Sequence, residues 1–287
     1  MAANAEQKSD NYSPQYTTIS GRKFGYYIPS SYNPSNPTPL LFMFHGMGGN
    51  SGEKSGGSAE NSYYGWQTSA EKNGFIVLFP ESKSFLKTWK LGAGGNSSDL
   101  TFVNNLIKWS KENYNINDSQ IFTTGHSWGA YFSYYIAKEF KNQITAFAAH
   151  SGGLGGNFFL GTTPSVPDVQ DFDSKLNAII LHAVDDGIVP FSNSQSLYDD
   201  LIRKGHNVYQ DGVGSNGIIE VKGWGPDKHR YRMEHNQTQW DFFQSVALDS
   251  ITAANNLTFT GSNPGNGIYN GGSGTDTLNY TSATAGI

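Results

Sequence analysis

The sequence predicts an α/β fold built on a doubly wound, mostly parallel sheet, and three features of its 287 residues lead to this prediction. Short, wholly apolar runs, typical of strands buried on both faces, alternate with stretches of helical periodicity. Glycine-rich and polar loops follow the ends of several of these runs. The length suits one large domain. In such sheets reactive groups gather at the carboxyl ends of the strands, so a site is expected in these loops.

The first elements are expected to be an edge hairpin and two buried strands. Residues 16–19 and 24–28 are rich in aromatic and β-branched side chains and flank a Ser-Gly-Arg turn, which indicates an antiparallel hairpin. Residues 40–44 and 75–79 are wholly apolar, as strands buried on both faces are. A helix near residues 59–72 is expected to connect them.

The middle of the chain is predicted to run helix, strand, helix. Residues 99–114 place Leu106 and Ile107 on one face and lysines on the other, which is the pattern of an amphipathic helix. Residues 121–124 form a β-rich run that predicts a strand, and residues 130–141 return to a helical pattern.

The last part of the predicted sheet continues this alternation. Strands are expected at residues 144–149 and 178–183, and helices at residues 193–204 and 238–248. Two short apolar runs, residues 208–209 and 218–221, are interpreted as the final strands and are expected to form a hairpin.

A Gly-x-Ser-x-Gly motif lies between the strand at 121–124 and the helix that follows it, with Gly125, Ser127 and Gly129 at its fixed positions. In this context the motif is the nucleophile elbow of α/β-hydrolases, a tight turn that holds the serine in strained backbone geometry with its hydroxyl exposed. Glycine is expected at both ends because a Cβ there would collide with neighbouring backbone. Ser127 is therefore predicted to be a nucleophile.

An activated serine needs a base, and an acid that orients the base; in α/β-hydrolases they follow in the order Ser, Asp or Glu, His. The strand predicted at 178–183 leads into Asp185 and Asp186, and then into Val189 and Pro190. The acid usually opens a D-x-x-V-P turn, which favours Asp186. Asp185 stays as the alternative and fits a solvated acidic turn better.

Two histidines beyond the acid are candidates for the base. His235 lies just ahead of the predicted C-terminal helix, where the base usually stands, and it is favoured on position. His229 lies in a basic stretch, residues 228–232, and is interpreted as a surface histidine. His206 follows a helix too closely to reach the strand ends easily.

The oxyanion of a tetrahedral intermediate needs two backbone N–H donors. One is expected from Trp128, the residue after the nucleophile. The second is expected from Met47, in the His-Gly-Met-Gly-Gly loop that follows the buried strand at 40–44.

Aromatic residues near strand ends are candidates for contacts with a substrate. Trp89 lies in a glycine-rich loop, and Phe158 and Phe159 lie in the long loop at 154–176, where they could form a lid or a wall. The remaining histidines in the elbow and at strand ends are expected to be structural: His126, His150 and His182.

Composition limits the classes of partner that the chain is expected to bind. A net charge of -5 gives no electrostatic reason to expect binding to nucleic acid or to an anionic membrane surface. The lack of cysteine excludes disulfides, thiolate catalysis and cysteine-based zinc sites. No apolar run approaches the roughly 20 residues of a membrane span. We expect no metal and no cofactor, and an ester substrate, small or polymeric, as the partner.

The composition changes at residue 249 to Gly, Asn, Ser and Thr. Residues 15–248 are predicted to form the catalytic domain and residues 249–287 a tail. Residues 271–279 fit the nonapeptide of calcium-binding β-rolls and resemble a repeat of the secreted RTX proteins. Because about three repeats are needed to build a core, calcium binding is expected only with a longer repeat region. This resemblance, with a polar stretch at residues 1–10 that lacks a secretory h-region, implies export without an N-terminal signal peptide.

Residues 16–247 resemble the secreted α/β-hydrolases grouped as poly(3-hydroxybutyrate) depolymerase-like and feruloyl or acetylxylan esterase-like. The motifs that carry the resemblance are Phe-Gly-Tyr-Tyr-Ile-Pro at 24–29, the strand and loop at 41–49, Asn-Gly-Phe-Ile-Val-Leu-Phe-Pro-Glu at 73–81, Asp-Leu-Thr-Phe-Val at 99–103, the elbow, His182 with Asp186 and Val189-Pro190, and His235 with Trp-Asp-Phe-Phe at 240–243.

The resemblance implies a serine-dependent carboxylic ester hydrolase that acts through an acyl-enzyme on feruloyl, acetyl or polyhydroxyalkanoate esters. It assigns Ser127, Asp186 and His235 to the triad and Met47 and Trp128 to the oxyanion hole. The chain departs from the pattern in having no disulfides, and in having Met-Glu-His-Asn where many members have Gly-His-Thr-Trp-Pro. The alternatives are a peptidase or acyltransferase on the same fold, and a non-catalytic calcium-linked extracellular binding module.

Overall fold

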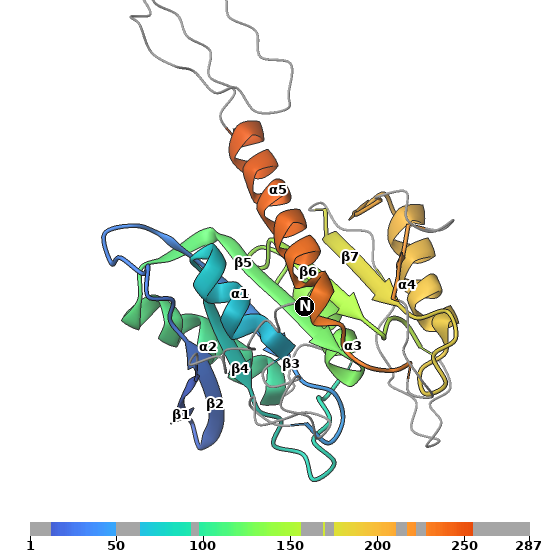
Figure 1. Ribbon diagram of the computed structural model, residues 1–287, viewed down its shortest axis with the longest axis horizontal. Helices are drawn as coiled ribbons and strands as arrows, with labels where there is room; N and C mark the ends of the chain where they lie inside the picture. Colours follow the sequence, from blue (N-terminus) through green and yellow to red (C-terminus); the bar gives the residue numbers. More distant parts are fainter. Residues whose placement is uncertain are drawn as a thin grey trace, which may run out of the picture.

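The predicted α/β architecture is confirmed by the structure, a computed structural model that describes residues 13–49, 64–92, 98–155, 169, 175–210, 217–221 and 228–254, with side chains to residue 247. One sheet runs through these residues (Figure 1). Its strands are β1 (Gln15–Ile19), β2 (Arg22–Tyr27), β3 (Thr38–Phe44), β4 (Ile76–Pro80), β5 (Ile116–His126), β6 (Ala146–His150), β7 (Asn177–His182), β8 (Asn207–Val208) and β9 (Ile219–Glu220).

The strand order makes the sheet mostly parallel. It runs β1-β2-β4-β3-β5-β6-β7-β8, and β9 also pairs with β7. The edge hairpin of β1 and β2 is antiparallel and joins β4 in antiparallel register. All pairings from β4 through β3, β5, β6 and β7 to β8 are parallel. The carboxyl ends of β3, β5, β6 and β7 therefore lie along one edge, which is where α/β sheets carry their sites.

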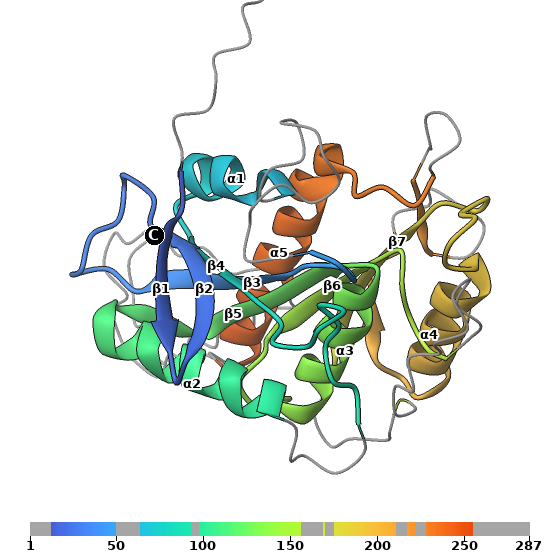
Figure 2. The same cartoon turned by 90° about the horizontal axis from the view of Figure 1, so that it is seen from below.

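Helices cover both faces of the sheet (Figure 2). On one face lie α2 (Ser98–Asn113), α3 (Trp128–Glu139) and α4 (Phe191–Arg203), which pack into one apolar cluster. On the other face lie α1 (Trp66–Asn73) and the long α5 (Asn236–Ala254), which pack into a second cluster.

Strand β3 shows why its sequence is wholly apolar. Leu40, Phe42 and Phe44 contribute to the cluster under α2, α3 and α4, whereas Leu41 and Met43 contribute to the cluster under α1 and α5. Successive side chains of a strand point to opposite faces, so a strand covered on both faces has no position for a polar residue.

Two expectations for the C-terminal part are corrected. Strands β8 and β9 do not form a hairpin: each pairs in parallel with β7, Asn207 opposite Asn177 and Ile219 opposite Leu181. The two short runs pair with different parts of β7, β8 with its first residues and β9 with its last. Local sequence does not specify which strand a short run will pair with. Helix α5 begins two residues earlier than expected and continues to Ala254, past the domain boundary predicted at 248.

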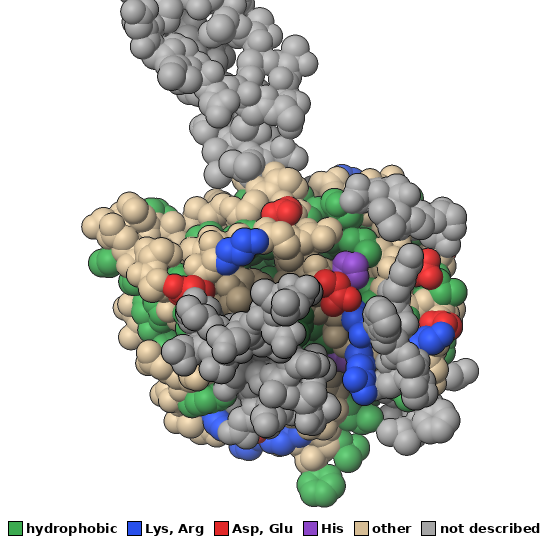
Figure 3. All heavy atoms as spheres, viewed as in Figure 1, with side chains coloured by type: hydrophobic (Ala, Val, Ile, Leu, Met, Phe, Trp, Pro, Cys, Tyr) green, Lys and Arg blue, Asp and Glu red, His purple; other side chains and the backbone are tan. Residues whose placement is uncertain are grey.

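The predicted RTX-like repeat lies outside the described residues. No helix in the described part of the chain combines the length and apolarity that crossing a bilayer requires. On the face shown in Figure 3, acidic and basic side chains are interspersed, without a large patch of one sign.

Candidate active site

The nucleophile elbow forms where β5 passes into α3, as the Gly-x-Ser-x-Gly motif predicts. Ser127 has φ 56° and ψ −121°, a strained conformation for a residue with a side chain. A Cβ on Gly125 would lie 2.2 Å from the carbonyl oxygen of Gly129, and one on Gly129 would lie 2.1 Å from the carbonyl oxygen of Phe44. The two glycines let strand and helix backbones touch, and this contact forces the turn at Ser127.

Asp186 lies in the turn after β7 and has the hydrogen bonds that a catalytic acid needs. Its Oδ1 accepts the backbone N–H groups of Ile188 (2.8 Å) and Val189 (2.9 Å), which fix the carboxylate. Its Oδ2 lies 2.6 Å from Nδ1 of His229. The alternative, Asp185, forms an ion pair with Lys228 instead and is more than half exposed.

His229, and not His235, is the histidine that reaches the nucleophile. Its Nε2 lies 2.8 Å from Oγ of Ser127 while its Nδ1 faces Asp186, so it joins the two as the base of a triad does. The prediction of His235 is corrected by this geometry. His235 lies six residues further on, in the short 3-10 turn Met233–His235 that leads directly into α5. The interpretation of His229 as a surface histidine is corrected as well, since its side chain is only 12% exposed.

The segment that carries the base, residues 228–232, has no regular secondary structure and is held by side chains from distant elements. His126, from inside the elbow, has Nε2 2.8 Å from the carbonyl oxygen of His229. The N–H of Arg232 donates to Nε2 of His150, at the end of β6 (3.2 Å). The hydroxyl of Tyr231 accepts from Nε1 of Trp66 (2.8 Å). We call residues 228–232 the base segment.

His126 and His150 were expected to be structural, and these contacts show what they hold: both rings bind the base segment, 103 and 82 residues away in the chain. Because a carbonyl only accepts, Nε2 of His126 carries a hydrogen. Because the N–H of Arg232 donates to it, Nε2 of His150 does not. Each imidazole is a neutral tautomer with a defined partner, and both belong to the support of the base.

The electrostatics of the site keep Asp186 charged and the supporting histidines neutral. Burial alone would raise the pKa of Asp186, but hydrogen bonds from His182 and His229 outweigh it and hold that pKa well below the usual value. Burial lowers the pKa of His126 to about 3, helped by the proximity of His229. Burial likewise lowers the pKa of His150 well below its ordinary value. The base segment is thus positioned by uncharged rings.

The loop after β3 lies directly against the nucleophile. A Cβ on Gly46 would lie 3.2 Å from Cβ of Ser127 and 3.7 Å from its Oγ. The N–H groups of Gly48 and Gly49 donate to the carbonyl oxygens of Leu86 and Gly46, both at 3.1 Å. These two N–H groups are therefore bound within the fold, and the predicted donor, Met47, lies between Gly46 and Gly48 in this loop.

Trp89 supports this loop and does not contact solvent, which corrects its assignment to substrate binding. It is 1% exposed, and its ring stacks on Phe132 at 4.6 Å between centroids. Its Nε1 donates to the carbonyl oxygen of His45 (2.9 Å), and its own carbonyl accepts from Nε1 of Trp128 (2.8 Å). Phe158 and Phe159 lie outside the described residues. Among the residues that the structure does describe, no group of three or more His, Asp or Glu side chains is placed to hold a metal ion.

Comparison with curated proteins gives relatives that are esterases by name. The chain is 25% identical over 216 residues to the probable feruloyl esterase C of Aspergillus niger, covering 73% of each protein. It is 24% identical over 256 residues to the bifunctional acetylxylan esterase/xylanase of Neocallimastix patriciarum, covering 82% of this chain and 35% of that protein. The chain thus spans only about a third of that larger relative.

Solved structures share the fold. A ferulic acid esterase from Anaeromyces mucronatus, in complex with ferulic acid, superposes with a TM-score of 0.58 at 17% identity, covering 85% of this chain and 94% of that one. A thermostable esterase gives 0.59 at 21% identity, covering 83% and 63%. The Esterase family model, described as "Putative esterase", matches residues 17–240. The chain therefore belongs to the Esterase family and is a carboxylic ester hydrolase.

Proposed function

We propose that Ser127, His229 and Asp186 form the catalytic triad of a two-step acyl transfer. The observation that carries the proposal is the continuous line of contacts from Ser127 Oγ to His229 Nε2 (2.8 Å) and from His229 Nδ1 to Asp186 Oδ2 (2.6 Å). Asp186 fixes the tautomer with hydrogen on Nδ1, which leaves the lone pair of Nε2 directed at the serine hydroxyl.

In the first step His229 takes the proton of Ser127 as Oγ attacks the ester carbonyl. The N–H groups of Met47 and Trp128 stabilise the oxyanion, and protonated His229 then gives its proton to the leaving alcohol. In the second step His229 activates water, which attacks the acyl-enzyme and releases the acid. Asp186 stays ionised throughout and stabilises the imidazolium form of His229.

The proposed substrates are feruloyl or acetyl esters, including those carried by polysaccharides. Support comes from the relatives, which are named feruloyl esterase, acetylxylan esterase and xylanase. Polyhydroxyalkanoate esters, suggested by the sequence resemblance alone, are the second candidate class. Action outside the cell is part of the same proposal, and calcium binding would require a longer repeat region than the one copy at residues 271–279.

The triad is tested by labelling with a fluorophosphonate and by replacing the nucleophile. Ser127→Ala should lower kcat/KM for p-nitrophenyl acetate by on the order of 10⁴-fold and abolish labelling, because the residues of a triad act as a unit. Ser69→Ala, on α1, is the matched control and should label normally. Retention of labelling by Ser127→Ala would reject the proposal.

The substrate class is tested with paired initial rates on methyl ferulate, acetylated xylan and a 3-hydroxybutyrate oligomer. Preference for the first or second supports the proposed class. Preference for the oligomer would replace it with the polyester class and leave the triad unaffected.

A further inference from the structure

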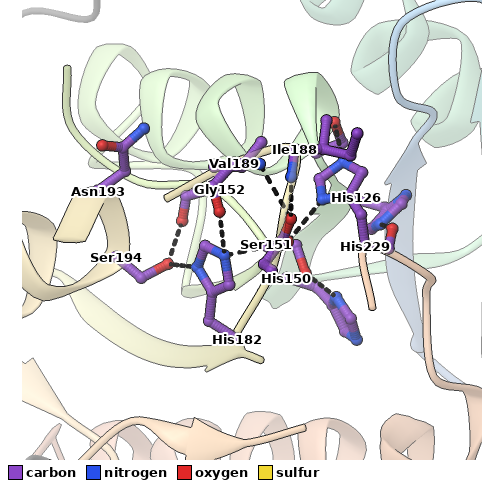
Figure 4. Close-up of polar contacts among 12 residues, drawn as sticks. His126, His150, Ser151, Gly152, His182, Ile188, Val189, Asn193, Ser194 and His229 are labelled. Carbon is purple, nitrogen blue, oxygen red and sulfur yellow. Dashed lines mark hydrogen bonds and ion pairs between the residues drawn. The ribbon is translucent and has the colours of Figure 1, made fainter. Parts of the chain in front are cut away.

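His182 closes β7 and is completely buried, as is the carboxylate of Asp186 four residues later. The sequence predicts a structural role for it. Figure 4 shows its ring between Ser194 and the turn that holds Ile188 and Val189. Its contacts connect it to the proposed acid.

The hydrogen on the His182 ring can be placed by chemistry alone. Its Nε2 lies 3.0 Å from the carbonyl oxygen of Val189 and 3.2 Å from Oδ2 of Asp186. A carbonyl and a carboxylate only accept hydrogen bonds, so Nε2 must carry a hydrogen. That N–H is shared between the two oxygens, and it donates to the same Oδ2 that accepts from Nδ1 of His229.

The other nitrogen fixes the orientation of the ring. Nδ1 of His182 lies 2.6 Å from Oγ of Ser194 on α4, and that hydroxyl lies 2.8 Å from the carbonyl oxygen of Gly152. Gly152 packs on the elbow, since a Cβ there would lie 2.8 Å from the carbonyl oxygen of Ser127. The ring is thus held by Ser194 of α4, which in turn binds Gly152 in the loop after β6, next to the elbow.

We propose that His182 is a positioning residue for the proposed triad: by donating to Oδ2 of Asp186 it competes with His229 for that oxygen and lowers the basicity of the Asp186–His229 pair. The inference rests on the proposed function. A carboxylate with one hydrogen-bond donor fewer holds a neighbouring imidazolium more strongly. Without His182, His229 would therefore keep its proton to higher pH, and less of the enzyme would carry the free base at mildly acidic pH.

The other titratable groups that face this cluster do not change charge in the relevant range. Burial lowers the pKa of His126 to about 3 and lowers that of His150 well below its usual range. Burial raises the pKa of the Tyr131 phenol to about 12. The ion pair of Asp185 with Lys228 lies at the exposed side of the turn. A shift in the pH profile can therefore be read as a change in the Asp186–His229 pair.

The test is the pH dependence of kcat/KM across roughly pH 5 to 9, where the acid limb reports the base of the free enzyme. His182→Leu removes the donor and should move the acid limb upward by roughly half to one pH unit, because the carboxylate becomes more basic. On the steep part of the limb kcat/KM should fall by about 3- to 10-fold, as a shift of half to one pH unit requires. His182→Gln places an amide N–H near the position of Nε2 and should bring the limb back toward the wild-type position.

His182→Asn separates this role from a structural one, because its amide can reach Ser194 but not Asp186. It should behave like His182→Leu, which keeps the test valid even if the leucine variant fails to fold. His206→Leu, at a buried histidine whose Nδ1 accepts from the N–H of Leu176 (3.2 Å), is the matched control and should leave the limb in place.

An acid limb that does not move in folded His182→Leu or His182→Asn protein would overturn the inference. The failure of the proposed function is distinguishable from this result. If Ser127→Ala stays active, the triad is wrong; if Ser127→Ala is inactive and only the limb of the His182 variants is unchanged, then only the role of His182 is wrong.

Discussion

The nucleophile elbow and the base segment reach the same point in space by opposite means. The elbow joins two regular elements, β5 and α3, and its turn is forced by backbone contacts at Gly125 and Gly129. The base segment has no regular structure, and its position depends on hydrogen bonds from His126, His150 and Trp66, which come from three separate elements. Ser127 is thus positioned by contacts between neighbouring elements of the chain, whereas His229, the proposed base, is positioned by tertiary contacts.

This difference has a consequence for how each region responds to change. A side chain added in the elbow collides with main-chain atoms that cannot move, so the expected damage is to folding. A side chain removed from around the base segment leaves the sheet intact, so the expected damage is to the alignment of His229 with Ser127. The predictions below test this contrast.

The largest expected effect is on activity, from loss of the base. His229→Asn should lower kcat/KM for p-nitrophenyl acetate by on the order of 10⁴-fold with little change in thermal unfolding, since the proton of Ser127 loses its acceptor. His235→Asn is the control, and its kcat/KM should stay within about threefold of wild type because His235 lies outside the line of contacts from Ser127 through His229 to Asp186. A loss confined to His235→Asn would return the base to the position favoured by sequence.

The second effect is on folding and comes from the elbow. Gly129→Ala places a Cβ 2.1 Å from the carbonyl oxygen of Phe44, where neither backbone can give way. We expect the free energy of unfolding to fall by about 4 kcal/mol or more, or the soluble yield to be lost. Gly92→Ala, whose Cβ would meet nothing within 4 Å, is the matched control and should unfold like wild type in urea. A stable Gly129→Ala protein would show that the elbow is not fixed by that contact.

The third effect is the loss of stability in acid, and it concerns the histidines that link the two regions. Burial lowers the pKa of His126 from 6.5 to about 3 and that of His45, beside the oxyanion loop, to about 4. Below pH 6.5 the unfolded chain takes up protons that the folded protein does not, so the free energy of unfolding falls as pH falls through this window. Each of these histidines contributes up to about 1.4 kcal/mol per pH unit.

The measurement is urea unfolding at pH 7.5, 6.5, 5.5 and 4.5. The slope of the free energy of unfolding against pH reports the number of protons taken up on unfolding. His126→Gln should reduce this slope by up to one proton relative to wild type, while His235→Gln, at a half-buried ring, should reduce it less. If the slopes of wild type and His126→Gln are the same, the His126 ring is not buried in the neutral form.

The smallest effect is on the alignment of the base segment. His126→Leu removes the donor to the carbonyl oxygen of His229 and should lower kcat by about 10-fold with KM unchanged, because one hydrogen bond that orients the base is lost. His126→Gln can still donate to that carbonyl and should recover most of the loss. A change confined to KM, or no recovery with glutamine, would mean that His126 does not act through His229.

The sequence predicted those parts of the site that depend on local pattern. Ser127 and its flanking glycines follow from a strand-turn-helix motif, and Asp186 follows from a turn whose N–H groups at Ile188 and Val189 bind the carboxylate within three residues. Each of these needs only neighbours in the chain. The alternation of Leu40 to Phe44 likewise predicted a strand covered on both faces.

The errors concern residues whose partners are remote in the chain. Trp89 was expected at a substrate surface, but its indole bonds to His45, and its ring stacks on Phe132. Strands β8 and β9 were expected to pair with each other, but both pair with β7. In each case the sequence predicts the kind of residue or element correctly. Which of several possible partners it contacts depends on packing between parts that are distant in the chain.

The sequence by itself determined the α/β sheet, the strained serine and the acid, because steric exclusion and short-range hydrogen bonds act between residues that are close in the chain. Only the tertiary structure shows which histidine contacts Ser127 and is therefore the proposed base. His229 and His235 both follow the acid, and position in the chain favours His235; the contacts that select His229 span 102 and 103 residues, from Ser127 and His126 to His229. Such contacts form only after the sheet has brought the ends of β5, β6 and β7 to one edge.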